Sequence, residues 1–175
     1  RALVLTALFA ALTAVGAFLK IPLGLSSITL QFFFTAMAGM LLGPRYGALS
    51  QAVYVLLGLL GLPVFTQGGG LGYLVHPTCG FLFGLIAAAW VVGALTKGES
   101  GFGRVALACT AGLGVLYLVG IPYMHLVLNF YLGRSMTLLG TLKAGMLVFL
   151  PGDFLKILVV ALLARPLRRA LSRGY

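Results

Sequence analysis

Charged side chains are scarce in this sequence. Asp, Glu, Lys and Arg together make up 8% of the 175 residues, whereas a typical soluble domain carries roughly 25%. Hydrophobic residues make up 61%, and the mean hydropathy is +1.13. Because so few polar side chains cannot keep a chain dispersed in water, the sequence predicts an integral membrane protein.

Residues that commonly serve in catalysis or metal binding are scarcer still. The whole chain has two acidic residues, two histidines and two cysteines. Cys79 and Cys109 lie in apolar segments without Cys-x-x-Cys spacing, so we expect buried apolar side chains rather than a disulfide or metal site. The sequence has no His-Glu-x-x-His motif, no clustered acid–base set and no Gly-Lys dipeptide for a phosphate loop. It therefore predicts no enzyme and no cofactor. The basic residues are scattered between apolar runs, which argues against a nucleic-acid partner.

Six apolar runs divide the chain. A straight membrane-spanning helix needs about 20 residues, so the second and third runs are short and the fourth is longer than needed. Gly43-Pro44-Arg45 leaves room only for a tight turn between the second and third. We expect an all-α integral membrane protein with six transmembrane helices in a single domain over residues 1–175. The runs are Ala2–Leu19, Ile28–Gly43, Tyr46–Leu62, Leu71–Leu95, Val105–Ile121 and Ala144–Ala164.

Basic residues are unequally divided between the two sides of this predicted bundle. One side has eight Lys or Arg residues and the other has three. Since an excess of positive charge marks the cytoplasmic side, we expect both termini in the cytoplasm and membrane lipid around the helices. The eight are Arg1, Arg45, Lys97, Arg104, Arg165, Arg168, Arg169 and Arg173, and the three are Lys20, Arg134 and Lys143.

The three connections on the other side carry little charge and are rich in Gly, Pro and aromatic residues. They are residues 20–27, 63–70 and 122–143. Two interpretations are open. The connections either fold back over an apolar cavity, where glycine permits close approach of the backbone, or are plain tight turns. We favour the cavity, because a solvated loop ordinarily carries more charge.

Asp153 and Lys156 lie inside the last apolar run, AGMLVFLPGDFLKILVVALLA. A charge in hydrocarbon costs several kcal/mol, so such a residue marks a functional site by default, and positions i and i+3 share a helix face. We favour a ligand-binding pair, with Pro151 and Gly152 directing Asp153 towards a cavity. A structural ion pair that fixes helix packing is the alternative. Counted from Gly145, a continuous helix would place Lys156 near the middle of the membrane.

Five segments in order resemble a known family. Together they are similar to the biotin-specific substrate-binding (S) components of energy-coupling-factor (ECF) vitamin transporters, the BioY family, over nearly the whole chain from Ala7 to Ala164. The Pro-Gly-Asp-x-x-Lys motif in the last segment is the strongest element. The segments are Ile28–Gln31 (ITLQ), Leu42–Ala48 (LGPRYGA), Leu57–Phe65 (LGLLGLPVF), the loop Gly68–Gly72 and Phe149–Lys156 (FLPGDFLK).

The resemblance implies a prokaryotic cell-membrane protein with six helices and both termini cytoplasmic, which agrees with the count of basic residues. It implies that the single domain binds a substrate near the outer face, under the loops after the first, third and fifth helices. It implies biotin as the ligand, and a transmembrane coupling subunit and two ATPase subunits as partners. The resemblance assigns Ala7 and Ala11, at small-xxx-small spacing on the first helix, to the coupling subunit; packing within the bundle is the alternative.

The candidate ligand contacts begin with the charged pair. The ureido ring of biotin has two N–H donors, which a buried carboxylate at Asp153 matches, and a carbonyl that the Lys156 ammonium matches. A polar amide, a glycine-rich lid and three aromatic rings are further candidates. Their respective alternatives are a bond to a neighbouring helix, a simple turn and plain packing. They are Gln31; Gln67, Gly68, Gly69 and Gly70; and Tyr73, Phe81 and Phe149.

One family motif differs in this chain. The family usually reads Gly-Pro-Thr/Ser-Gly-Gly-Tyr where this sequence has His76-Pro-Thr-Cys-Gly-Phe81, and some relatives have an Arg where this sequence has Leu82. The resemblance therefore assigns no residue of this chain to the carboxylate of the ligand.

A proton-coupled carrier of a small vitamin or metabolite, with Asp153 as the titrating group, is the alternative function. Proton coupling predicts transport that collapses with the proton gradient while ATP is kept high. An S component predicts the reverse.

Overall fold

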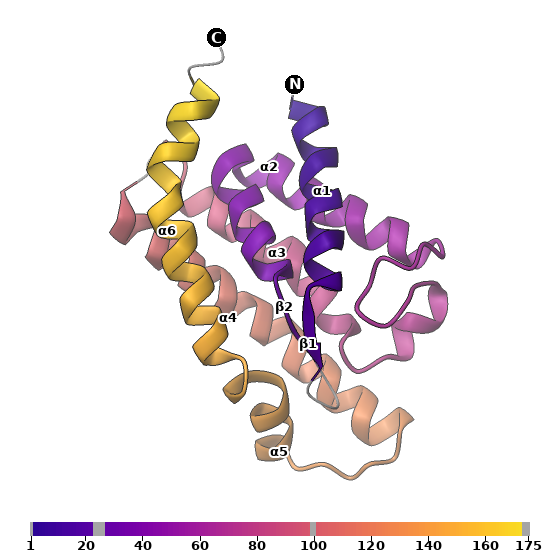
Figure 1. Cartoon of the computed structure of the whole chain (residues 1–175). Helices are drawn as coiled ribbons and strands as arrows, with labels where there is room; N and C mark the ends of the chain where they lie inside the picture. Colours follow the sequence, from indigo (N-terminus) through magenta and orange to yellow (C-terminus); the bar gives the residue numbers. More distant parts are fainter. Residues whose placement is uncertain (1, 23–26, 99–100, 173–175) are drawn as a thin grey trace.

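The computed structural model describes residues 2–22, 27–98 and 101–172. The chain is mostly helical, and Figure 1 shows an elongated bundle in which the start of α1 and the end of α6 lie at the same end. The helices are α1 (Ala2–Phe18), α2 (Gln31–Leu59), α3 (Cys79–Leu95), α4 (Phe102–Leu126), α5 (Leu138–Leu142) and α6 (Leu150–Ser172).

Helix α2 contains most of the second and third predicted runs, but it begins at Gln31 and not at the predicted Ile28, and it ends at Leu59 and not at Leu62. Gly43 interrupts it with non-helical angles, φ 80° and ψ −179°, a conformation that glycine adopts without a side-chain clash. A Cβ added at Gly47 would lie 2.7 Å from the Cα of Gly39, so the two arms fold back closely on each other. The predicted tight turn at Gly43–Arg45 is confirmed.

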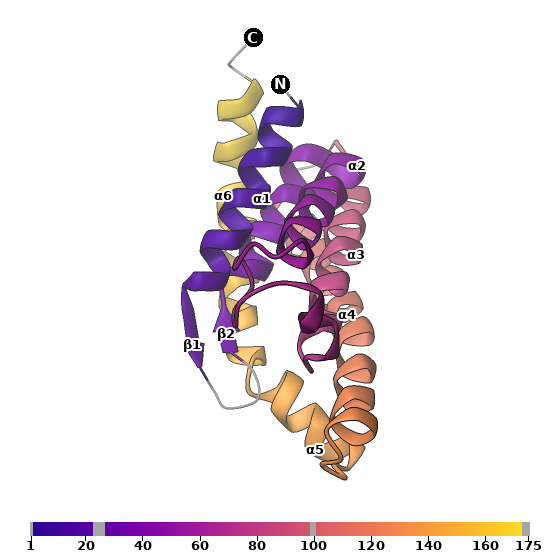
Figure 2. The ribbon, with the colours of Figure 1, turned by 90° about the vertical axis from the view of Figure 1, so that its right-hand side faces the viewer.

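A short β-hairpin is the exception to the all-α prediction. Strand β1 (Lys20–Pro22) pairs antiparallel with β2 (Ser27–Thr29), with Lys20 opposite Thr29. Pro22 lacks the backbone donor that a helix needs, so the chain between α1 and α2 satisfies its backbone groups by strand pairing. Figures 1 and 2 show the hairpin along the outside of the bundle. Residues 23–26 of this predicted connection lie outside the described part of the chain.

Three further predicted helix boundaries were wrong. The run that begins at Leu71 starts with a 3-10 turn, η1 (Leu71–Val75), and α3 begins only at Cys79, because the residue before a proline is held in extended conformation, as His76 is. Helix α4 continues past Ile121 into the π turn η2 (Val127–Tyr131). The predicted connection 122–143 is therefore largely helical, and a second π turn, η3 (Lys143–Leu147), precedes α6.

Large apolar side chains cover the outside of the bundle. Leu118 on α4 and Phe154 on α6 are each 75% exposed, and exposed apolar surface of this extent marks a membrane or protein contact. Two helical stretches, Phe102–Tyr131 and Leu138–Ser172, are long and apolar enough to cross a membrane, while α1 and α3 are apolar but shorter. The count of six spans stays a prediction.

The interior holds the two cysteines and a basic side chain from α6. Cys79 and Cys109 are both buried and free, so the prediction of buried small side chains is confirmed. Arg168 on α6 donates to the backbone carbonyls of Met40 and Thr96 at 2.7 and 2.6 Å. The Met40 carbonyl lies near the end of the first arm of α2, and the Thr96 carbonyl lies at the end of α3. The guanidinium therefore connects α6 to both of these helices.

Candidate ligand-binding site

One cavity gathers residues that are far apart in the sequence. It holds about 650 Å³ of empty space, including its open mouth, and lies among α2, α3, α4, α6, the hairpin and the loop before α3. Its wall combines aromatic and aliphatic groups with a few polar ones, as small-molecule sites usually do. The lining residues are Ser27, Thr29, Gln31, Phe32, Thr66, Tyr73, Thr78, Phe81, Leu82, Leu85, Leu116, Tyr117, Gly145, Phe149, Asp153 and Lys156.

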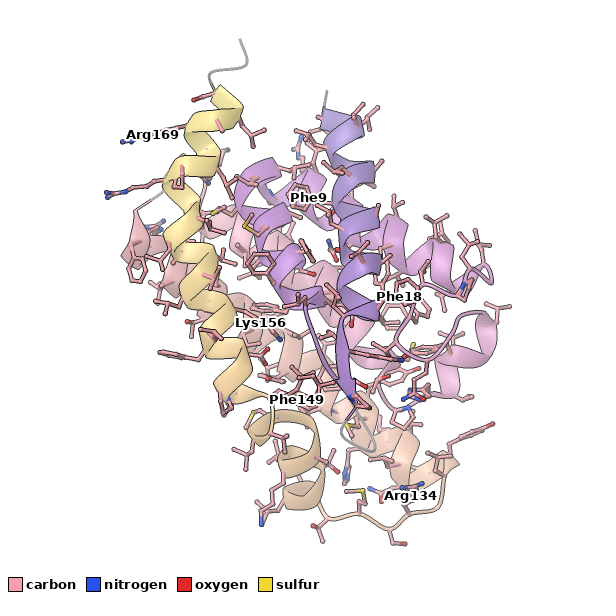
Figure 3. The ribbon with its side chains drawn as sticks, in the orientation of Figure 1. Phe9, Phe18, Arg134, Phe149, Lys156 and Arg169 are labelled. Atoms are coloured by element: carbon pink, nitrogen blue, oxygen red, sulfur yellow. The ribbon has the colours of Figure 1, made fainter. Side chains whose placement is uncertain are left out.

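Asp153 and Lys156 form an ion pair in the wall of this cavity. The Asp153 Oδ1 to Lys156 Nζ distance is 2.7 Å, and the side chains are 7% and 10% exposed. Both belong to the first two turns of α6, and Figure 3 shows Lys156 on this helix, beyond Phe149. Because α6 begins at Leu150, Asp153 lies in its first turn, where the helix dipole favours negative charge. The helix does not run continuously from Gly145, as the predicted depth of Lys156 assumed, and that depth stays a prediction.

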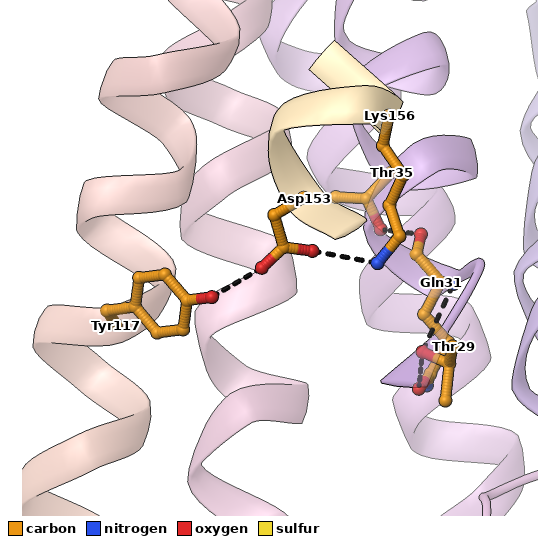
Figure 4. Close-up of polar contacts among 6 residues, drawn as sticks. All are labelled: Thr29, Gln31, Thr35, Tyr117, Asp153 and Lys156. Carbon is orange, nitrogen blue, oxygen red and sulfur yellow. Dashed lines mark hydrogen bonds and ion pairs between the residues drawn. The ribbon is translucent and has the colours of Figure 1, made fainter. Parts of the chain in front are cut away.

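Tyr117 on α4 is the third member of this group. Its hydroxyl donates to Asp153 Oδ2 while Lys156 donates to Oδ1, so the carboxylate lies between two donors (Figure 4). The Tyr117 ring meets Phe81 edge to face, with 6.4 Å between the ring centroids. Sequence reasoning missed Tyr117, because one tyrosine among seven in an apolar helix has no distinguishing pattern.

Gln31 lines the cavity and also bonds its neighbours. Its Oε1 accepts from the Thr29 hydroxyl at 3.0 Å, and its Nε2 donates to the Tyr54 hydroxyl at 2.8 Å. The network continues through Thr35 to Gln51 at 2.9 Å, which joins the two arms of α2. Figure 4 shows Gln31 beside Thr29 and Thr35. The structure thus combines the two roles that the sequence left open for this amide, a cavity-facing group and a helix–helix contact.

The three candidate aromatic residues also line the cavity. Tyr73 and Phe149 are 6% and 8% exposed, and Phe81 is half-buried. The Tyr73 hydroxyl lies between the hydroxyls of Thr66 and Thr78, at 3.0 and 3.1 Å. Tyr73 therefore presents a ring and a bound hydroxyl to the same space, which suits a ligand with apolar and polar parts.

The predicted glycine-rich lid, Gln67 to Gly70, is not part of the cavity lining. Gln67 is exposed and bonds His76 Nε2 at 3.1 Å, and the Gly70 N–H donates to the Gly58 carbonyl at the end of α2 at 2.7 Å. Neither these two residues nor Gly68 and Gly69 line the cavity, whereas neighbouring Thr66 does. Contact of this loop with a ligand stays a prediction.

His76 does not line the cavity but contacts two residues that do, Tyr73 and Thr78. Its ring stacks on Tyr73 at 4.8 Å between centroids, and its Nδ1 lies 2.8 Å from the Thr78 hydroxyl. Partial burial lowers the pKa of this histidine from its usual 6.5, so the folded protein favours the neutral ring.

The lowered pKa of His76 predicts a loss of stability in acid. Above about pH 6.5 the ring is neutral in both the folded and unfolded states, and as the pH falls below that value the unfolded state binds the proton more readily. We expect the melting temperature in detergent to fall between about pH 6.5 and pH 5, and to fall less in His76→Gln. Equal pH profiles for the two proteins would contradict this.

Comparisons with known proteins agree on one family. The family model described as the BioY family matches residues 1–173. The chain belongs to the BioY family. A probable biotin transporter BioY of Lysinibacillus sphaericus is 45% identical over 94% of this chain and 85% of its own length. The biotin transporter BioY of Thermotoga maritima is 41% identical over 97% of this chain and 96% of its own length.

A solved structure shares the fold of this BioY-family chain. It is a crystal structure of the S-component for biotin from an ECF-type ABC transporter. The two structures superpose with a TM-score of 0.81 at 29% sequence identity, over 96% of this chain and 90% of the other. The helical fold predicted by the resemblance is thus found in a solved relative, and the resemblance itself is confirmed.

Proposed function

We propose that this chain binds biotin in the cavity between α6, α4 and α2 and serves as the substrate-binding component through which an ECF-type transporter takes biotin into the cell. The observation that carries this is the buried Asp153–Lys156 pair in the wall of a mostly apolar cavity. The family and its biotin-transporting relatives agree with it.

The ring system of biotin has matching groups in the cavity. The ureido N–H groups donate to the Asp153 carboxylate and the ureido oxygen accepts from Lys156, giving charge-assisted bonds in a dry site. The apolar rings of the vitamin pack against Tyr73, Phe81 and Phe149. Gln31 provides a further amide at the wall. No bond of the ligand is broken, so the chain acts as a binding protein and not as an enzyme.

We further propose one transmembrane substrate-binding domain over residues 1–175 in a prokaryotic cell membrane, with six spans and both termini in the cytoplasm. The spans are α1, the two arms of α2, α3, α4 and the stretch from α5 to α6. Basic side chains of the described chain gather with Ala2 around one depression at the end where α1 begins and α6 ends, as expected of a cytoplasmic face. They are Lys97, Arg165, Arg168 and Arg169; Arg1 and Arg173 lie outside the described residues.

Binding of labelled biotin to the detergent-purified chain tests the proposal. We expect saturable binding that unlabelled biotin displaces and that thiamine and riboflavin do not. In vesicles that also contain a coupling subunit and two ATPase subunits, uptake should require ATP and survive dissipation of the proton gradient. Uptake that instead stops with the gradient while ATP is high would favour the proton-coupled carrier.

Tyr117→Phe should weaken biotin binding by about tenfold. The phenylalanine keeps the contact with Phe81 but removes the hydroxyl that holds Asp153, and a hydrogen bond to a charged group contributes about 1.5–3 kcal/mol. Titration calorimetry of the variant measures the loss, with the exposed Tyr131→Phe as a matched control of unchanged affinity. Unchanged affinity in Tyr117→Phe would show that Lys156 positions the carboxylate unaided.

A further inference from the structure

Among the described residues, the cavity wall has no free positive charge for the carboxylate, the one charged group of biotin. Among the lining residues only Asp153 and Lys156 are charged, and they are paired with each other at 2.7 Å. In the proposed complex Lys156 stays paired with Asp153 and donates to the ureido oxygen, so it lies at the ring end of the ligand, away from the valerate carboxylate. A cation from outside the wall is therefore needed for the valerate end of the ligand.

Lys20 lies next to the cavity wall through two independent contacts. In the hairpin it is the cross-strand partner of Thr29, which lines the cavity. Its ammonium also donates to the backbone carbonyl of Thr66, another lining residue that comes from the loop after α2. Lys20 thus joins the hairpin to that loop at the edge of the cavity.

The remaining basic residues on the proposed outer side lie elsewhere. Arg134 lines a separate depression with Gln67 and His76, and Lys143 is exposed on the π turn before α6 without lining the cavity. Lys20 is exposed, so its ammonium keeps its hydration and its flexible stem can exchange the neutral Thr66 carbonyl for a charged acceptor. An ammonium bound to a carboxylate forms a stronger hydrogen bond than one bound to a neutral carbonyl.

We propose that Lys20 binds the carboxylate of the ligand at the edge of the cavity, beside Thr29 and Thr66. This rests on the proposed function, since it concerns the tail of the same ligand. The ureido ring then binds between Asp153 and Lys156 while the tail extends towards Thr29 and Thr66. Lys20 would select ligands with an anionic tail, and the Asp153–Lys156 pair would select the ring.

Biotin and biotinamide, in which a neutral amide replaces the carboxylate, separate the two contributions. We expect the wild-type protein to bind biotin about two- to fivefold more tightly than biotinamide, an effect of the size expected for an exposed ion pair. Lys20→Gln should weaken biotin binding by that factor and leave biotinamide unchanged, so that the preference disappears. Lys20→Arg should restore it, and 0.5 M salt should reduce it in the wild type.

Lys143→Gln is the matched control, since it removes one exposed lysine from the same proposed side and should retain the preference. If Lys20→Gln binds both ligands more weakly by the same factor, the lysine only holds the Thr66 loop, and the inference is overturned. An unchanged preference in Lys20→Gln overturns it as well. A wild-type protein that binds neither ligand would overturn the proposed function and the inference together.

Discussion

Replacing Asp153 with Asn should lower the affinity for biotin by at least about 2 kcal/mol, or roughly thirtyfold. The carboxylate accepts from Lys156 at one oxygen and from Tyr117 at the other, and in the proposed complex it also accepts from the ureido N–H groups. The amide keeps the shape but has one acceptor oxygen, and its NH₂ group faces a donor. Titration calorimetry of the purified variant measures the change.

The control measurement is whether the Asp153→Asn variant still folds. Because the amide keeps the shape of the carboxylate but leaves Lys156 without its counter-charge, we expect Asp153→Asn to elute at the same volume as the wild-type protein, with a reduced melting temperature. The exchanged pair, Asp153→Lys with Lys156→Asp, should restore the melting temperature but not the binding, because the acceptor and donor then face the ligand in the wrong order. Normal biotin binding by the exchanged pair would show that the two residues are only a structural clasp.

The charged pair could be predicted from the sequence because acidic residues are rare in this chain. One of two acidic residues in the chain lies in an apolar run, and helical spacing links it to Lys156. The rest of the cavity has no such signal. Tyr117 is recognisable only once α4 packs beside the start of α6, and Thr29 and Thr66 become neighbours of the site through a hairpin and a loop that no periodicity predicts.

Helix boundaries show a second limit of the sequence. Apolar runs predict which segments are buried in protein or lipid, but Leu71–Val75 is as apolar as α3 and still forms a separate turn, because Pro77 holds the residue before it in extended conformation. On the α6 side of the cavity, the π turn at Lys143–Leu147 precedes the helix, so α6 begins at Leu150 and not at Ala144, where the apolar run begins. This late start places Asp153 in the first turn of a helix, where the helix dipole stabilises its charge.

Contact with the coupling subunit is the other prediction with a large expected effect. On α1 the side chains of Ala7 and Ala11 are exposed, whereas neighbouring Ala10 is buried at 5% exposure. The exposed pair is one turn apart on the face that α1 turns away from the bundle. Small residues let helices approach closely in lipid, so this strip fits a partner helix better than it fits packing within the chain.

We therefore expect Ala7→Trp with Ala11→Trp to abolish assembly with the coupling and ATPase subunits while the solitary protein still binds biotin. Two indole rings would hold a partner helix away from the backbone of α1, whereas in lipid the exposed side of α1 has room for them. Co-purification through an affinity tag on the coupling subunit measures assembly, and labelled biotin measures binding.

Two single variants serve as controls. Leu118→Trp adds bulk on α4 at a side chain that is 75% exposed, and it should retain both assembly and biotin binding. Ala10→Trp should instead damage the bundle and lose biotin binding. If the double variant loses biotin binding as Ala10→Trp does, the alanine strip belongs to the interior of the protein and the coupling subunit binds elsewhere.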